Sequence, residues 1–135
     1  MKKLLSIVSL LISQDILANC YVAENFSGPS ALAVDGYTTS EDGFAGIKFE
    51  IEIEIDEQKA TVTPDFGTSC LAMSELIAIC SGGIDGKVTT IEMYSIDVRQ
   101  KKVIYVQVRN GLEAALLSDL NGAKLFIGDI TGNCD

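Results

Sequence analysis

Histidine and tryptophan are absent from the 135 residues of this chain, and only two prolines are present. Without histidine, the usual Ser-His-Asp and Cys-His forms of catalysis are excluded, as are zinc and haem sites that need an imidazole ligand. The chain also lacks a CxxC pair, a Walker loop and a GxGxxG motif. These absences exclude the common signatures of thiol redox chemistry and nucleotide binding. We therefore expect no cofactor, no metal site and no catalytic residue.

Positive charge is scarce. The chain has 10 basic and 19 acidic residues, which gives a formal net charge of −9. A surface with this balance repels nucleic acid and anionic lipid and attracts cationic molecules. The composition thus predicts no nucleic-acid partner and favours a cationic protein as partner.

Long apolar runs are also missing, apart from a short one near the start. Met1-Lys2-Lys3 precedes the mostly apolar residues 4–12, the pattern of a secretory signal with a cut after Ala18. The run is about half of the ~20 residues that a membrane-spanning helix needs, so no integral membrane segment is expected after cleavage. Residues 19–135 then form one domain. The predicted location is the bacterial periplasm or the secreted fraction.

Leu17-Ala18-Asn19-Cys20 offers a different processing route. It is similar to a bacterial lipobox, in which Cys20 would be lipidated and would anchor the protein. That route would leave an odd number of thiols for disulfide pairing, so we prefer the secreted form and keep the lipid anchor as the alternative.

The four cysteines form an even set, which suits two disulfides in an oxidising compartment. Three pairings are possible. A hairpin of residues 70–73 against 77–80 places Cys70 opposite Cys80, near enough for a cross-strand disulfide. Cys20 and Cys134 would then join the two ends of the domain.

The stretch Ile47–Asp56 has large apolar side chains at every odd position and charged ones at every even position. This period of two predicts a strand, Phe44–Asp56, with its isoleucine face in the core. A turn at Asp56–Lys59 would return the chain so that Ile55 lies opposite Ala60.

Other segments complete an all-β, mainly antiparallel prediction. Turns are expected at 81–86 and 99–102. Further strands are expected at 20–23, 31–34, 87–98, 103–108 and 123–130, and a short helix at 112–120. Segment 87–98 has apolar side chains on both faces, which indicates either a bulge or two covered faces. Eight or nine short strands favour a small barrel of about eight strands, with a β-sandwich as the alternative.

Carboxylates are the main candidates for a site. Glu50, Glu52, Glu54 and Asp56 project from one strand face at roughly 6.6–6.8 Å intervals. The simplest interpretation is a solvated face that prevents strands from aggregating. A docking surface for a cationic protein is the functional alternative. Paired acids of a glycosidase have similar spacing, but they need a cleft that an open strand face does not provide.

Two tyrosines are the second candidate. Tyr94 and Tyr105 are expected as half-buried cross-strand partners, or as ligand contacts if they line the mouth of a barrel. A barrel of this size can hold one small ligand or fill with its own side chains.

These features favour a small exported acidic β domain that acts as a non-catalytic protein-binding module, for example as an inhibitor of a cationic protein. In size, export signal and cysteine content the chain is similar, in general terms, to small periplasmic inhibitors of lysozyme. The alternative is a carrier of a small apolar ligand in the barrel interior. An enzyme that uses carboxylates alone is the third hypothesis.

Overall fold

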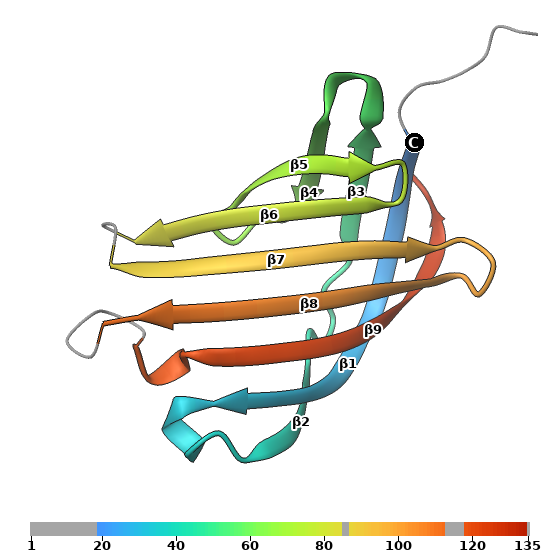
Figure 1. Ribbon diagram of the computed structural model, residues 1–135. Helices are drawn as coiled ribbons and strands as arrows, with labels where there is room; N and C mark the ends of the chain where they lie inside the picture. Colours follow the sequence, from blue (N-terminus) through green and yellow to red (C-terminus); the bar gives the residue numbers. More distant parts are fainter. Residues whose placement is uncertain (1–18, 85–86, 113–117, 135) are drawn as a thin grey trace, which may run out of the picture.

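The computed structural model of this chain describes residues 19–84, 87–112 and 118–134, which form one β-sheet (Figure 1). Its strands are β1 (Asn19–Leu32), β2 (Thr39–Gly43), β3 (Phe49–Glu54), β4 (Lys59–Thr63), β5 (Ser69–Ser74), β6 (Ile77–Ile84), β7 (Val88–Asp97), β8 (Lys102–Gly111) and β9 (Gly122–Asn133). Short 3-10 helices are η2 (Ala33–Asp35), η3 (Ile55–Glu57) and η4 (Ser118–Leu120).

The sheet closes on itself. Its strand order is β2-β1-β3-β4-β5-β6-β7-β8-β9, and β1 also pairs with β9. Every pair is antiparallel. Eight strands therefore form a closed barrel, and β2 is an extra strand on the second half of β1. The predicted small all-β barrel is confirmed.

Strand β1 replaces the two short strands that were expected at 20–23 and 31–34. Its first half pairs with β3 and its second half with β2, while β9 follows it on the other side. The register shifts between Glu24 and Ser27, where Asn25 has a φ of 61°. A Cβ on Gly28 would lie 2.1 Å from the carbonyl oxygen of Leu125, so the two strands approach closely at this point. The bulged strand bends and serves both neighbours.

The β3–β4 hairpin has a different register from the predicted one. Ile53, and not Ile55, lies opposite Ala60, because residues 55–57 form η3 and Gln58 closes the turn with a φ of 53°. The turn is therefore longer, and β3 is shorter than Phe44–Asp56. Since the shift is two residues, the apolar faces of both strands still point inward.

Aromatic rings fill the middle of the barrel. The rings of Tyr94 and Tyr105 lie 5.1 Å apart, and Phe44 lies 5.1 Å from both Tyr105 and Phe126. The buried apolar core also includes Ala23, Phe26, Phe49, Ile51, Ile53, Ala60, Val62, Ala72, Ala78, Cys80, Ile96 and Val103.

Strands β6, β7 and β8 settle the question left open by segment 87–98. The β7–β8 pairing has no register shift between Val88 and Asp97, so no bulge changes the phase. Tyr94 is buried and Ile91 is half-exposed, which means that both faces of β7 have apolar side chains. Of the turn predicted at 81–86, residues 81–84 instead continue β6, and residues 85–86 lie outside the described residues.

Part of the predicted helix at 112–120 lies outside the described residues, namely 113–117. Within the described part, only the 3-10 helix η4 at Ser118–Leu120 is present. No helix in the described ranges is long and apolar enough to cross a membrane.

Both predicted disulfides are present. Cys20 is bonded to Cys134, and Cys70 to Cys80, which lies directly opposite it in the β5–β6 hairpin. Two disulfides indicate an oxidising, extracytoplasmic compartment.

Candidate functional site

The four predicted acidic residues form a strip on the outside of the barrel. Glu50, Glu52 and Glu54 alternate with the buried side of β3, and Asp56 follows in η3. Glu50 and Asp56 are exposed, whereas Glu52 and Glu54 are half-buried. We call these four residues the acidic strip. The structure thus places Glu50, Glu52 and Glu54 on the outer face of β3, and Asp56 in the turn that follows.

Lysines do not neutralise the acidic strip. Lys59 lies opposite Glu54 in the β3–β4 ladder. Among the described residues, however, ion pairs join only Lys102 to Asp129 and Lys124 to Asp42. The carboxylates of the strip therefore remain available to a cationic partner.

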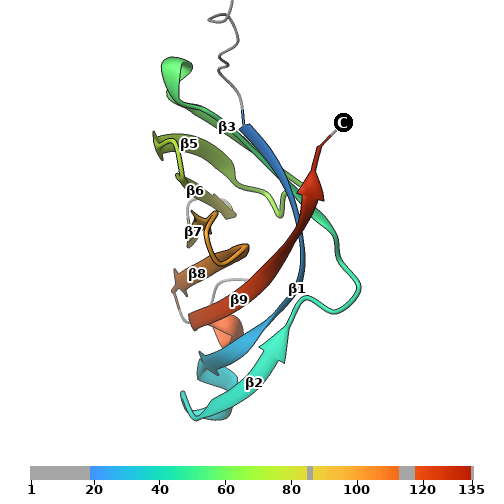
Figure 2. The same ribbon diagram turned by 90° about the vertical axis from the view of Figure 1, so that its right-hand side faces the viewer.

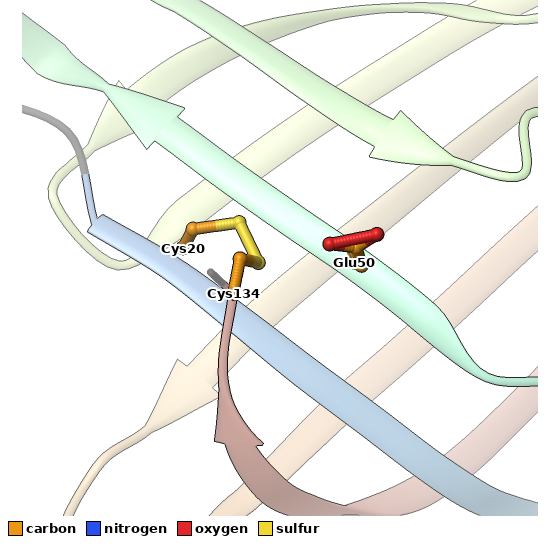
Figure 3. A group of neighbouring side chains, drawn as sticks. All are labelled: Cys20, Glu50 and Cys134. Atoms are coloured by element: carbon orange, nitrogen blue, oxygen red, sulfur yellow. A yellow bond between two sulfur atoms is a disulfide. The ribbon is translucent and has the colours of Figure 1, made fainter.

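A disulfide lies beside the acidic strip (Figure 3). The Glu50 carboxylate and the sulfur atoms of Cys20 and Cys134 lie within 4.8 Å of one another. Such a group resembles a metal-ligand set, but the two sulfurs are bonded together and have no thiolate to offer a metal. The disulfide instead joins the start of β1 to Cys134, which directly follows the end of β9.

The second predicted pair, Tyr94 and Tyr105, lies in the core. Their exposed fractions are 2% and 0%. Burial raises the pKa of both phenols far above the ordinary value, and the charge of Glu92 raises it further. These side chains fill the barrel and do not line its mouth.

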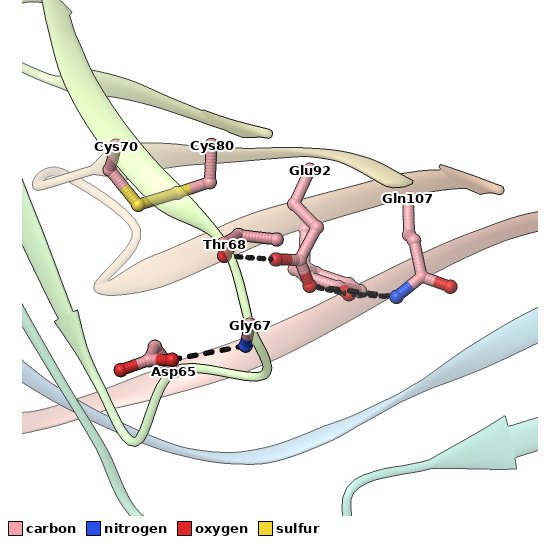
Figure 4. The surroundings of a disulfide bond; sticks show 8 residues. Asp65, Gly67, Thr68, Cys70, Cys80, Glu92 and Gln107 are labelled. Atoms are coloured by element: carbon pink, nitrogen blue, oxygen red, sulfur yellow. Dashed lines mark hydrogen bonds between the residues drawn. A yellow bond between two sulfur atoms is a disulfide. The ribbon is translucent and has the colours of Figure 1, made fainter. Parts of the chain in front are cut away.

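Strand β7 also contains a buried carboxylate, Glu92, which the sequence did not lead us to expect. Glu92 is only 2% exposed. Its Oε1 accepts a hydrogen bond from Thr68 Oγ1 at 3.1 Å, and its Oε2 accepts one from the Tyr105 hydroxyl at 2.5 Å. Gln107 Nε2 donates to the Tyr105 hydroxyl at 2.7 Å and lies 3.5 Å from Glu92 Oε2. Figure 4 shows Thr68, Glu92 and Gln107 converging near the Cys70–Cys80 disulfide.

Glu92 belongs to a polar row that crosses the barrel interior. Glu92 lies opposite Gln107, Gln107 opposite Lys124, and Lys124 opposite Ser30. We call these four residues the inner polar row. The signal for it was present in the sequence, because Glu92 has the same parity as Tyr94 and Ile96 and must share their face.

Lys124, a member of this row, forms an ion pair with Asp42. Its Nζ lies 3.1 Å from Asp42 Oδ2 and 5.6 Å from the ring centroid of Phe126. Burial alone would raise the pKa of Asp42. Hydrogen bonds from Gly43 N and Lys124, with the charge of Lys124, outweigh that effect and hold the pKa below its ordinary value.

A small cavity opens beside the inner polar row. Its volume is about 90 Å³, and Arg109 at its wall donates from Nε to Thr90 Oγ1 at 3.1 Å. The other lining residues are Phe66, Gly67, Thr68, Gly82, Gly83 and Val88. This partly polar space suits a few water molecules, since sites for drug-sized ligands measure roughly 300–1,000 Å³.

Comparison with protein-family models, with curated proteins and with solved structures finds no match to this chain.

Proposed function

We propose that this protein is a non-catalytic, exported binding module that contacts a cationic protein through the acidic strip. The observation that supports this most directly is the row of carboxylates on β3, which point outward and have no ion-pair partner among the described residues. The closed barrel fixes the backbone of these residues, so little backbone order must be gained on binding.

An inhibitor of a cationic wall-degrading enzyme would fit this role. The charge of −9 accelerates encounter with a basic partner, and the strip provides the local contact. The carrier alternative has less support. Aromatic side chains occupy the barrel centre, where a ligand carried in the barrel interior would have to lie.

The proposed location is the bacterial periplasm or the extracellular medium after removal of residues 1–18. The Cys20–Cys134 disulfide supports this route over a lipid anchor, because one sulfur atom cannot form both a disulfide and a thioether. The intact mass of the exported protein distinguishes the two routes.

Charge reversal tests the proposed function. Wild-type protein is immobilised, partners are captured from bacterial and host extracts at low salt, and the affinity of each is measured by calorimetry. The double variant Glu50→Lys, Glu52→Lys should bind a captured basic protein at least about tenfold more weakly, because like charges then face each other. High salt should weaken wild-type binding as well.

The double variant Asp35→Lys, Glu41→Lys is the matched control. It changes the net charge equally at exposed positions outside the strip. If both double variants lost the same affinity, the effect would come from net charge alone. That result would overturn the assignment of the binding surface to the acidic strip. Capture of no basic partner by wild type would overturn the proposed function itself.

A further inference from the structure

An apolar row crosses the outside of five strands. Leu71 in β5 lies opposite Ile79, Ile79 opposite Met93, Met93 opposite Val106, and Val106 opposite Leu125 in β9. Each step joins hydrogen-bonded neighbours, so these side chains touch across the sheet. Leu71 is 62% exposed and Leu125 is 46% exposed.

Flanking rows widen this surface. On one side Ile91 lies opposite Val108, and Val108 lies opposite Ala123. On the other side, Ile104 lies opposite Ile127, which is 42% exposed. We call this surface the outer apolar face; it comprises Leu71, Ile77, Ile79, Ile91, Met93, Ile104, Val106, Val108, Ala123, Leu125 and Ile127. Single exposed apolar residues are common on proteins, but a contiguous patch of this kind marks an interaction site.

Polar groups surround the outer apolar face. At one end Asp97 lies opposite Lys102, and Lys102 lies opposite Asp129, with 2.6 Å between Lys102 Nζ and Asp129 Oδ1. At the other end Thr89 lies opposite Asn110. None of the described positions in the three apolar rows has a charged side chain. An uncharged centre with a polar rim is the usual anatomy of a protein interface.

The size and shape of this side of the barrel suit a protein partner. Figure 2 shows β5, β6, β7 and β8 one above another in a nearly straight column, so this wall is close to flat. The three apolar rows, about 6.7 Å apart along five strands that are themselves about 4.8 Å apart, span roughly 500 Å². A standard interface needs about 800 Å² from each partner, so the polar rim must supply the remainder.

We propose that a second copy of this chain covers the outer apolar face, so that two barrels pack sheet on sheet as a symmetric dimer. Two chains with a charge of −9 each repel one another over most of their surfaces, and this face is a wide area without charge at its centre. A strongly cationic partner would gain no ion pair there. Because one face meets its own copy, the contact closes and leaves no further site for growth.

The dimer does not depend on the proposed function. In the barrel order β1-β3-β4-β5-β6-β7-β8-β9, strand β3 is four strands away from β7 and therefore opposite it. In Figure 1, β3 lies behind the wall formed by β6, β7 and β8. Each copy keeps its acidic strip free, so the dimer would offer two strips on opposite sides.

Analytical ultracentrifugation of the exported protein with both disulfides formed tests this proposal. Wild type should sediment at twice the chain mass. Met93→Lys, at the centre of the face, should raise the dimer dissociation constant at least about tenfold, because symmetry buries two like charges. Val34→Lys is the matched control: Val34 is exposed in η2, outside the face, and its variant should dimerise like wild type.

Two further measurements keep the result interpretable. Val108→Thr changes a half-exposed side chain with little risk to folding, and it should weaken the dimer in a smaller but measurable way. Added salt should leave the dimer unchanged or strengthen it, whereas it should weaken binding through the acidic strip. A single-chain mass at the highest soluble concentration would overturn the dimer. A dimer that Met93→Lys leaves intact would also overturn the proposal. A protein that stays monomeric and binds lipid vesicles through this face would overturn it as well.

Discussion

Strands β3 and β8 each have aliphatic residues at every second position, but this aliphatic set points into the core in β3 and outward in β8. In β3 the apolar set, Phe49, Ile51 and Ile53, points inward and the glutamates point outward. In β8 the purely aliphatic set, Ile104, Val106 and Val108, points outward. Its inward set includes Tyr105, Gln107 and Arg109. Alternation therefore identifies a strand, but it does not tell which face is the core.

The difference between the two strands has a physical cause. The interior of an eight-stranded barrel is filled by large side chains, and Tyr105 with Tyr94 fills it opposite Phe49. Gln107 is accepted inside because Glu92 and the Tyr105 hydroxyl satisfy its amide. The aliphatic side chains of β8 are then left on the outside of the barrel.

The largest expected effect is a difference in the free energy of unfolding between variants of buried apolar residues in β3 and variants of residues in the outer apolar face. Ile51→Ala removes a fully buried side chain and should lower the free energy of unfolding by about 2–5 kcal/mol. Ile91→Ala removes a side chain that is half-exposed in the single chain, and it should cost about 1 kcal/mol or less. Urea unfolding of both variants measures the two values.

Protein concentration must be low in that experiment, because a dimer would add stability to wild type. At high concentration the cost of Ile91→Ala should grow, and the cost of Ile51→Ala should not. If Ile91→Ala cost as much as Ile51→Ala at low concentration, the outer apolar face would be part of the core of the single chain, and the contrast between the two strands would fail.

A second, smaller effect is the difference in stability between variants of a buried and an exposed glutamate. Glu92→Ala leaves the hydroxyls of Thr68 and Tyr105 without their acceptor and should cost about 2–3 kcal/mol. Glu50→Ala, on the exposed acidic strip, should change stability by about 0.5 kcal/mol or less. Thermal unfolding at neutral pH compares the two variants. A neutral Glu92→Ala would show that the inner polar row is dispensable for stability.

The sequence predicted the features that depend on local pattern. The β3 alternation, the opposition of Cys70 and Cys80, and the closed antiparallel architecture follow from period, spacing and strand number. The turn at residues 55–58 was missed because a helical turn ended by Gln58 in the left-handed region has no strong residue signature. The length of β1 was missed because a bulge at Asn25 interrupts its alternation.

The inner polar row was not predicted, for a different reason. Parity alone places Glu92 with Tyr94, but a glutamate normally marks the wet face of a strand. Only the fold shows that Tyr105 and Gln107 come from the neighbouring strand to satisfy the carboxylate. The outer apolar face also needed the register of five strands, because each strand contributes only one to three of its residues.

The smallest expected effect separates a buried phenol from an exposed one by pH. Burial raises the pKa of Tyr94 in the folded state above the ordinary value of 10.0. The folded protein therefore keeps a proton that the unfolded chain loses above pH 10, and stability falls as pH rises through that range. At one pH unit above the ordinary pKa of 10.0, one such group lowers the free energy of unfolding by about 1.4 kcal/mol. Tyr94→Phe should remove the contribution of Tyr94 to the loss of stability between pH 9 and about 11, and the contribution of Tyr105 should remain. Tyr37→Phe, at a residue that is 58% exposed, is the matched control for the loss of one phenol hydroxyl. Urea unfolding across this range measures the slopes, and absorbance at tyrosinate wavelengths follows ionisation. Ionisation of Tyr94 before unfolding would contradict its burial. It would then support the earlier alternative that Tyr94 lines the barrel mouth, where a ligand could contact it.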